Sequence, residues 1–341
     1  MSRSAPSSGI ALLVAAATAL LWANSPWSSA YFHLWQLQLS VGAGHLRISR
    51  SLNFWISDGL MALFFLLVGL EIRREMHAGT LASAKAALLP VMAAMGGIIV
   101  PALLYVGFNR EPPLRHGWAI PTATDIGFAT GVLALLGRRI SPSLRVLLLA
   151  IAVIDDIVAI LLIACFYSKG LTASAHPALA GVIIGLLMPM GLVRRVERRL
   201  YPWVTFAVMP LYAFANAGIS LHGFGTASHL SISLLFGIMA GLVIGKPLGI
   251  TLSTAFCVRA GWCELPEGID IKRVFVIGCI AGAGFTMSIF ICHLAFVDAT
   301  LATATLAVLL ASAAAALVGL IAGRWLLPVH STVTDLARFL G

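Results

Sequence analysis

The sequence contains very little charge. Of its 341 residues only 10% are charged, whereas 60% are hydrophobic. An ordinary soluble domain carries about 25% charged residues. This scarcity argues against a water-soluble enzyme, a disordered chain and a nucleic-acid-binding module. It predicts a protein that folds in lipid.

Cysteine is also scarce and shows no recognisable spacing. The five cysteines form no CxxC pair, and at least three lie in apolar runs. The pattern favours small buried hydrophobic residues over metal ligands or a disulfide framework. No redox role is predicted from it.

Long apolar runs dominate what is present. A helix needs about 20 apolar residues to cross the hydrocarbon layer, and ten segments approach that length. They are 9–25, 54–73, 85–108, 118–137, 144–167, 177–193, 203–222, 230–257, 271–297 and 301–327. The sequence therefore predicts an all-α polytopic membrane protein in which residues 1–341 form a single transmembrane domain. Membrane lipid is its expected surrounding.

The basic residues are distributed asymmetrically between alternate loops. The net charge is +9, yet only five basic residues fall in the loops opposite the N-terminus: Arg47, Arg50, Arg110, Arg115 and Lys169. All the other basic residues, except Lys246 inside an apolar segment, lie on the same side of the membrane as the N-terminus. Because Lys and Arg concentrate in cytoplasmic loops, both termini are expected to be cytoplasmic. The positive charge then reflects topology, and no nucleic-acid partner is expected.

The stretch 36–50, between the first two segments, has the pattern of a β-hairpin. Apolar and polar residues alternate in 35–41 and again in 45–49, on either side of Gly42-Ala43-Gly44. An isolated hairpin is only marginally stable in water. A second copy of the chain is the natural partner, so a homodimer formed through this hairpin is expected. An irregular loop is the alternative.

Five ionisable residues lie within the apolar segments. They are Asp58, Asp125, Asp155, Asp156 and Lys246. A charge at the bilayer centre costs about 2.5–3.5 kcal/mol on insertion scales, so such residues usually mark a transport pathway. Asp58 lies close to the end of its segment, where a structural role is equally reasonable.

The adjacent pair Asp155 and Asp156 lies in the middle of its segment. Neighbouring positions on a helix diverge by about 100°, so the two carboxylates cannot face one small ligand equally. They are expected to have different roles. Carboxylate oxygens suit sodium or lithium, and each cation must displace protons to bind.

Two segments carry interruptions that would break a helix. Pro121 disfavours helix before it, and Thr122 and Thr124 follow within an apolar run. A glycine-rich stretch, 278–288, interrupts a later segment. A pair of broken segments is a strong sequence pointer to a transporter site. Lys246 lies between them and is expected to pair with Asp155 or with the negative end of a broken helix.

Several motifs, in order along the chain, resemble the NhaA sodium/proton antiporters. They are FFLLVGLEIRRE at 64–75, WAIPTATDI at 118–126, IDD at 154–156, PLYAFANAG at 210–218, GKPLG at 245–249 and GFTMSIF at 284–290. The NhaA proteins are themselves an example of inverted repeats with broken helices. The resemblance implies this architecture in the bacterial inner membrane.

The resemblance also implies roles for individual residues. Asp156 matches the principal ion-binding carboxylate, and Asp155 matches its neighbour, associated with gating and with a salt bridge to Lys246. Thr124 and Asp125 match residues of the first break, where Asp125 balances the positive ends of half-helices. The metal expected at Asp155 and Asp156 is the transported ion, and no cofactor is expected.

Four further residues match positions linked to pH regulation. Glu71, Glu75 and Glu197 match acidic residues at the cytoplasmic entrance, and His176 matches a histidine associated with the pH profile. The hairpin at 36–50 resembles the dimerisation ribbon of the family.

The sequence departs from the family in two places. Members normally have twelve membrane helices, whereas here the loop 167–176 joins segments that two more helices usually separate. The stretch 196–202 lacks histidines that some members carry in the pH-sensing region. Alkaline activation would then depend on coupled carboxylates.

The sequence therefore predicts an electrogenic, pH-regulated antiporter that exchanges internal sodium or lithium for external protons, and not an enzyme. A degenerate homologue that lost transport with its two helices is the main alternative. An intramembrane aspartyl protease would need two carboxylates facing one water from separate helices. An organic-anion symporter would be expected to have a roomier, less acidic site.

Overall fold

The computed structural model describes residues 5–43, 46–167, 175–221 and 231–328 of the chain. Its elements are α1 (Ala5–Ala23), α2 (Ser28–Gln36), β1 (Gln38–Ala43), β2 (Leu46–Ser51), α3 (Leu52–Phe54), η1 (Trp55–Leu60), α4 (Met61–Ala78), η2 (Thr80–Ala82), α5 (Ala84–Phe108), η3 (Leu114–Thr122), α6 (Ile126–Leu135), η4 (Gly137–Arg139), α7 (Pro142–Leu162), η5 (Ile163–Tyr167), α8 (Ala175–Leu187), α9 (Met190–Trp203), η6 (Val204–Val208), α10 (Met209–Asn216), α11 (Ile232–Met239), η7 (Ala240–Gly245), α12 (Lys246–Arg259), α13 (Ile271–Ala281), α14 (Phe285–Ala295) and α15 (Asp298–Leu326).

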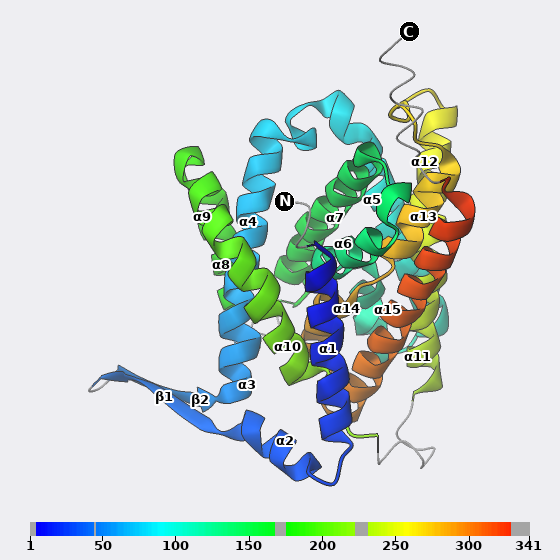
Figure 1. Cartoon of the computed structure of the whole chain (residues 1–341). Helices are drawn as coiled ribbons and strands as arrows, with labels where there is room; N and C mark the ends of the chain where they lie inside the picture. The colour runs from blue at the N-terminus through cyan, green and yellow to red at the C-terminus, as the bar shows by residue number, and fades with distance from the viewer. Residues whose placement is uncertain (1–4, 44–45, 168–174, 222–230, 329–341) are drawn as a thin grey trace.

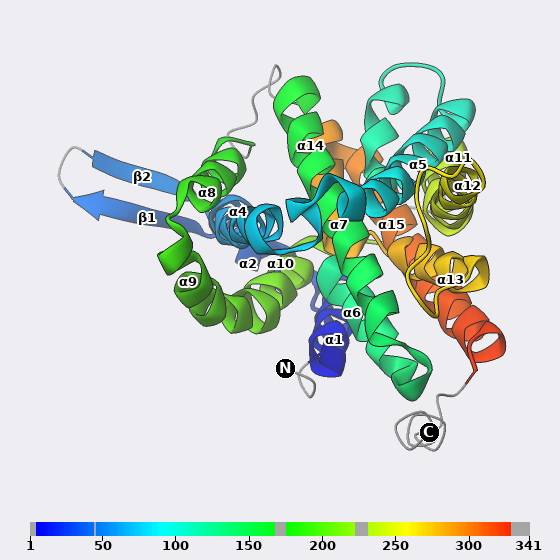
Figure 2. The same ribbon diagram turned by 90° about the horizontal axis from the view of Figure 1, so that it is seen from above.

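The helices form a bundle from which a two-stranded hairpin projects (Figure 1). Seen from above, α7 lies near the centre of the bundle (Figure 2). Helices α4, α8, α9 and α10 lie on one side of it, and α5, α11, α12, α13 and α15 lie on the other. The helix that carries Asp155 and Asp156 therefore lies between two groups of helices.

The helices confirm a polytopic membrane protein. Within the described ranges, five helices are long and apolar enough to span a membrane, and up to eight spans result if each bent helix pair counts as one. The predicted count of ten stays a prediction. One predicted boundary is wrong: the segment 177–193 ends at Leu187, because Pro189 interrupts the helix and α9 starts after it.

Glycines allow two helix pairs to approach at the backbone. A Cβ on Gly249 of α12 would lie 2.1 Å from the carbonyl oxygen of Gly96 in α5, and one on Gly69 of α4 would lie 2.6 Å from that of Val182 in α8. Small residues let membrane helices pack closely in this way. The α5–α12 contact matters most for the site, because α12 begins at Lys246.

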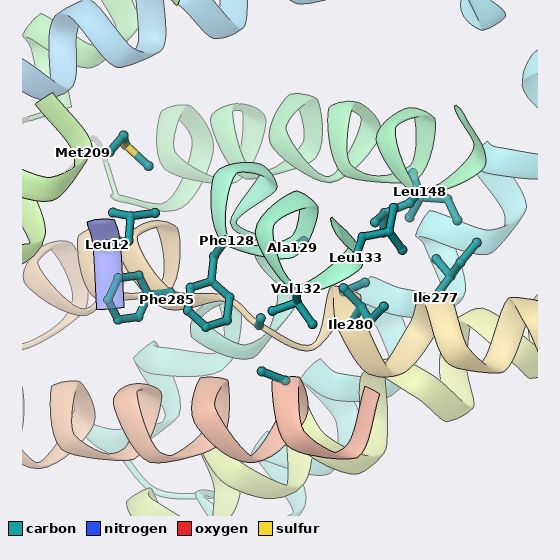
Figure 3. Packing of buried hydrophobic residues seen from close by; sticks show 14 of the residues in the cluster. Leu12, Phe128, Ala129, Val132, Leu133, Leu148, Met209, Ile277, Ile280 and Phe285 are labelled. Atoms are coloured by element: carbon teal, nitrogen blue, oxygen red, sulfur yellow. The ribbon is translucent and has the colours of Figure 1, made fainter. Parts of the chain in front are cut away.

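Apolar packing surrounds the broken helices. The rings of Phe128 in α6 and Phe285 in α14 stack with centroids 5.3 Å apart, and Leu12 of α1 lies beside them (Figure 3). Ile280 of α13 and Leu148 of α7 belong to the same buried cluster. This cluster fixes the two broken helices against α7.

The hairpin is present, but its first strand extends into the stretch that the sequence predicted as turn. The strands pair antiparallel from Gln38 opposite Ser51 to Ala43 opposite Leu46, so Gly42 and Ala43 are strand residues and not turn. Trp35 is not in the strand either. It lies in the last turn of α2, where it and Tyr31, four residues earlier, are both buried on one helical face.

Candidate functional site

The two interrupted segments are broken helices whose breaks lie against each other. The first pair, η3 and α6, is bent by 47°, and the second, α13 and α14, by 51°. The predicted interruptions are therefore present. We call the region where the breaks meet, residues 120–125 and 281–288, the crossing.

Each break satisfies the free backbone groups of the other. The Asp125 amide donates to the carbonyl of Ala283 at 2.9 Å. The Ser288 hydroxyl donates to the carbonyl of Ile120 at 2.8 Å. Non-helical backbone at membrane depth is tolerated only where it is buried in protein or lines a cavity. The crossing meets that condition because two breaks share their polar groups.

Asp125 binds the N-termini of two helices at once. One carboxylate oxygen accepts from the Phe128 amide of α6 at 2.9 Å. The other accepts from the Thr286 amide of α14 at 3.1 Å and also from the Thr286 hydroxyl. Helix N-termini carry partial positive charge. Asp125 thus places a buried negative group where two positive helix ends converge.

Lys246 shows the opposite arrangement: its positive charge is surrounded by negative groups. Its ammonium is fully buried and lies 2.9 Å from Asp155 Oδ2. It also donates to the carbonyl of Thr122, at the C-terminal end of η3, where the helix dipole is negative. Both partners considered from the sequence, a carboxylate and the negative end of a broken helix, therefore contact this lysine.

Thr124 links the lysine–carboxylate pair to the crossing. Its hydroxyl lies 2.7 Å from Asp155 Oδ2 and 3.0 Å from the carbonyl of Ala281 in α13. One hydroxyl proton can serve one acceptor at a time. A change in the state of Asp155 can therefore be transmitted to the backbone of the second broken helix.

Asp156 points elsewhere, as helix geometry requires for the neighbour of Asp155. It lines a cavity with Glu71 and Phe64 of α4, Tyr201 of α9 and Gly127 of α6. Asp156 is only 2% exposed, and its Oδ1 has no hydrogen-bond partner among the described residues. Asp156 is thus a buried carboxylate on the wall of a cavity lined by α1, α4, α6 and α9.

Asp155 also keeps one oxygen, Oδ1, without a hydrogen-bond partner within the described part of the chain. The two aspartates can thus each offer one oxygen to a small cation. No group of three or more His, Cys, Asp or Glu residues that could hold a metal occurs in the described ranges.

The acidic residues linked by resemblance to pH regulation lie around Arg74 of α4. Its guanidinium forms ion pairs with Glu197 of α9 and, at 3.3 Å, with Glu75. Glu75 also accepts from the Thr80 amide at 3.1 Å. Glu71 lies one helical turn before Arg74 and faces the cavity of Asp156. The side chain of His176 is outside the described residues.

Some residues of the site carry no clear sequence signal. Thr286 and Ser288 stand out in the sequence only as part of a glycine-rich stretch, and Ser312 of α15, which accepts from the Phe285 amide at 3.0 Å, does not stand out. The sequence gives no signal for Tyr201 either. A hydroxyl inside an apolar segment is the signal that could have found Ser312, whereas the carbonyls of Ala281 and Ala283 carry no signal at all.

Comparison with known proteins identifies the family. The model of the family described as "Na+/H+ antiporter 1" matches residues 1–175 and 171–322. The Na(+)/H(+) antiporter NhaA of Acidovorax sp. (strain JS42) is 47% identical, over 96% of this chain and 91% of the relative. The chain belongs to the NhaA Na+/H+ antiporter family.

Other NhaA relatives agree. The antiporter of Cupriavidus necator is 43% identical over 92% of this chain and 86% of the relative. The NhaA 2 antiporter of Pseudomonas putida (strain KT2440) is 41% identical over 93% of this chain and 90% of the relative. These relatives are named as transporters and not as enzymes, which leaves no support for the protease alternative.

The comparison also bears on the shortened loop. The alignment with the Acidovorax protein runs over 380 positions, more than the 341 residues of this chain, so that NhaA protein carries residues that this one lacks. The two matches to the NhaA family model meet at 171–175, inside the loop 167–176 where the resemblance implies that two helices are missing.

Proposed function

We propose that this protein exchanges sodium or lithium ions from the cytoplasm for external protons. The observation that carries the proposal is Asp156, a buried carboxylate with one oxygen free of hydrogen bonds that faces a cavity. The membership of the chain in the Na+/H+ antiporter family indicates the kind of exchange. A carboxylate oxygen can hold a proton or a sodium ion, but not both.

The two neighbouring aspartates have different roles in ion binding. Asp156 receives the cation from the cavity, while Asp155 is held by Lys246 and Thr124 when no cation is present. An arriving cation attracts Asp155 and weakens its contact with Lys246. The cation thereby replaces an internal ion pair, which limits the cost of carrying charge through the protein.

The crossing provides the mobile element for alternating access. Asp125 and the paired breaks satisfy the free helix ends at the crossing. Thr124 connects the state of Asp155 to Ala281 of the second break. Ion or proton occupancy can then favour an inward-open or an outward-open arrangement.

Electrogenic transport and pH regulation are part of the proposal. If Lys246 releases its proton when the cation draws Asp155 away, more protons than cations move in each cycle. The membrane potential would then drive exchange. The cluster of Glu71, Glu75 and Glu197 around Arg74 lies near the cavity and supports a role in pH activation, to which His176 also contributes.

The remaining architecture follows the family. We propose ten transmembrane segments in an inverted repeat, with both termini cytoplasmic, in the bacterial inner membrane. We also propose that residues 36–50 join two copies of the chain. The projection of β1 and β2 away from the bundle leaves this hairpin accessible to a partner (Figure 1).

The decisive test is Asp156→Asn in everted membrane vesicles containing a fluorescent pH indicator. Sodium- or lithium-induced dequenching, measured between mildly acid and alkaline pH, should be present in the wild type at alkaline pH and abolished in the variant at every pH. Asp298→Asn, the same change at an exposed position at the start of α15, is the matched control and should behave as the wild type. Wild-type exchange in Asp156→Asn would remove Asp156 from the mechanism.

The second candidate is a non-transporting homologue that lacks two helices. The short loop at 167–176 favours it, whereas the intact contacts of Asp125, Asp155 and Lys246 do not. Absence of any cation response in well-expressed wild-type protein, at every pH, would favour this candidate.

A further inference from the structure

Two of the five cysteines are neighbours in space. Cys257 is buried in the last turn of α12, and Cys263 lies in the loop before α13. Their sulfur atoms are 2.6 Å apart. A disulfide bond is about 2.05 Å long, so the reduced pair is already close to bonding distance. The spacing CxxxxxC gave no hint of this in the sequence.

The end of α12 creates this proximity. The Trp262 amide donates to the Cys257 carbonyl at 3.0 Å, and the Gly261 amide donates to the Val258 carbonyl at 3.1 Å. Gly261 has a φ of +73°, the left-handed conformation that glycine adopts at helix C-termini. The chain therefore folds back over the last turn and brings Cys263 onto Cys257.

The surroundings keep the turn in place and leave the pair accessible. The rings of Phe256 and Trp262 meet edge to face with centroids 5.6 Å apart, so the side chains next to both cysteines also meet. Cys257 is buried, whereas Cys263 is partly exposed. A small oxidant can therefore reach Cys263. The buried Cys257 can act as the resolving thiol, which forms the disulfide with the oxidised Cys263.

We propose that Cys257 and Cys263 form a thiol–disulfide modification site for peroxide-class oxidants. The Cys263 thiolate attacks hydrogen peroxide, which gives a sulfenic acid and, with one proton, one water. The Cys257 thiol then displaces the hydroxyl group, which leaves as a second water. Two S–H bonds break, one S–S bond forms, and the two electrons reduce the peroxide. This inference is independent of the proposed transport function.

The local chemistry sets the rate of this reaction. Burial, together with the hydrogen bond to Cys257, raises the pKa of the Cys263 thiol to about 12. The thiolate is the nucleophile, so oxidation is slow at neutral pH and speeds up in alkaline solution. Arg259, Lys272 and Arg273 flank the loop, and on the proposed topology it faces the reducing cytoplasm. The pair is then reduced at rest, and its oxidation needs peroxide and is fastest at alkaline pH.

The consequence for the fold is local and specific. The disulfide would close the loop 257–263 and lock the end of the helix that begins with Lys246. The other three cysteines differ: Cys165 is exposed, and Cys279 and Cys292 are buried. Among the described residues, no other pair of sulfurs lies within hydrogen-bonding distance.

The test uses full-length protein with Cys165→Ser, which removes the exposed thiol. Purified protein is treated with hydrogen peroxide at alkaline pH, denatured, alkylated with N-ethylmaleimide and analysed by mass spectrometry. Formation of the disulfide should protect two of the four remaining thiols, and the chain, after subtraction of its two N-ethylmaleimide adducts, should be about 2 Da lighter than the unmodified chain. Trypsin cleaves after Arg259, so the disulfide should join two separate peptides that dithiothreitol releases.

Cys165→Ser with Cys263→Ser is the comparison and should form no such linked peptides. The proposal is overturned if all remaining thiols of the Cys165→Ser protein stay alkylatable. It is equally overturned if their protection occurs without the mass loss or if the linked peptides contain other cysteines. Because the readout is a covalent bond, the result does not depend on whether the protein transports sodium.

Discussion

At the scale of single residues, the buried charges are matched to opposite ends of broken helices. Asp125 faces two helix N-termini, and Lys246 faces Asp155 and the C-terminal end of η3. The site thus compensates its charges with backbone dipoles as well as with side chains. Such compensation makes each charge costly to remove alone.

The pair of Lys246 and Asp155 permits a quantitative prediction. Lys246→Met or Asp155→Asn leaves one buried group without its partner, and such losses cost about 3–5 kcal/mol. The double variant removes both and should be less destabilised than the sum of the single variants. Unfolding of the purified proteins in detergent micelles by a denaturing detergent measures this cycle. Additive effects would mean that the two groups do not interact.

The site illustrates what a sequence reveals at this scale. Asp125, Asp155, Asp156 and Lys246 were predictable because ionisable residues in apolar runs are rare. The contacts of Thr286 with Asp125 could not be predicted, because threonine is common in apolar segments and carries no special signal there. Carbonyl groups such as that of Ala283 have no residue-type signal, so the mutual satisfaction of the two breaks appears only in three dimensions.

At the scale of elements, close helix packing determines where Lys246 lies. Helix α12 contacts α5 through Gly249 and Gly96, whose backbones meet with no room for a side chain. A larger residue at either glycine would push α12, which carries Lys246, away from α5.

Gly249→Ala should therefore lower stability by about 1–3 kcal/mol, the usual cost of overpacking. Gly107→Ala, in the exposed last turn of α5, is the matched control. A Cβ there meets no atom within 4 Å, and alanine is favoured in helices. Thermal unfolding in detergent compares the two. Equal melting temperatures would show that α5 and α12 separate easily.

Element boundaries show a second limit of prediction. The hydrophobic runs located the long helices, and the alternation at 35–49 located the hairpin. The helical face formed by Tyr31 and Trp35 was hidden because aromatic residues also favour strands. The end of the first strand was predicted too early because three small residues indicate a bend without fixing the strand register.

At the scale of the whole molecule, the hairpin projects from the helix bundle that contains the crossing (Figure 1). The Leu52 amide donates to the Leu37 carbonyl at 2.8 Å, so the two ends of the hairpin meet at the bundle. Residues 38–51 can be replaced by a short glycine linker without stretching the chain.

Removal of residues 38–51 should convert the proposed dimer to a monomer and keep sodium-dependent proton movement. Native mass spectrometry gives the oligomeric state, and dequenching in everted vesicles gives the activity. A dimer that survives the deletion would place the subunit contact on the helices instead.

The crossing also has a consequence for biosynthesis. Asp125 and Thr286 are 161 residues apart in the chain. At a synthesis rate of about 5–20 residues per second, the carboxylate waits roughly 8–30 s for that partner. During this interval η3 and α6 are already made, while Ala283, Thr286 and Ser288, which hydrogen-bond to their break, do not yet exist. The first broken helix must therefore reach its final arrangement after most of the protein has been translated.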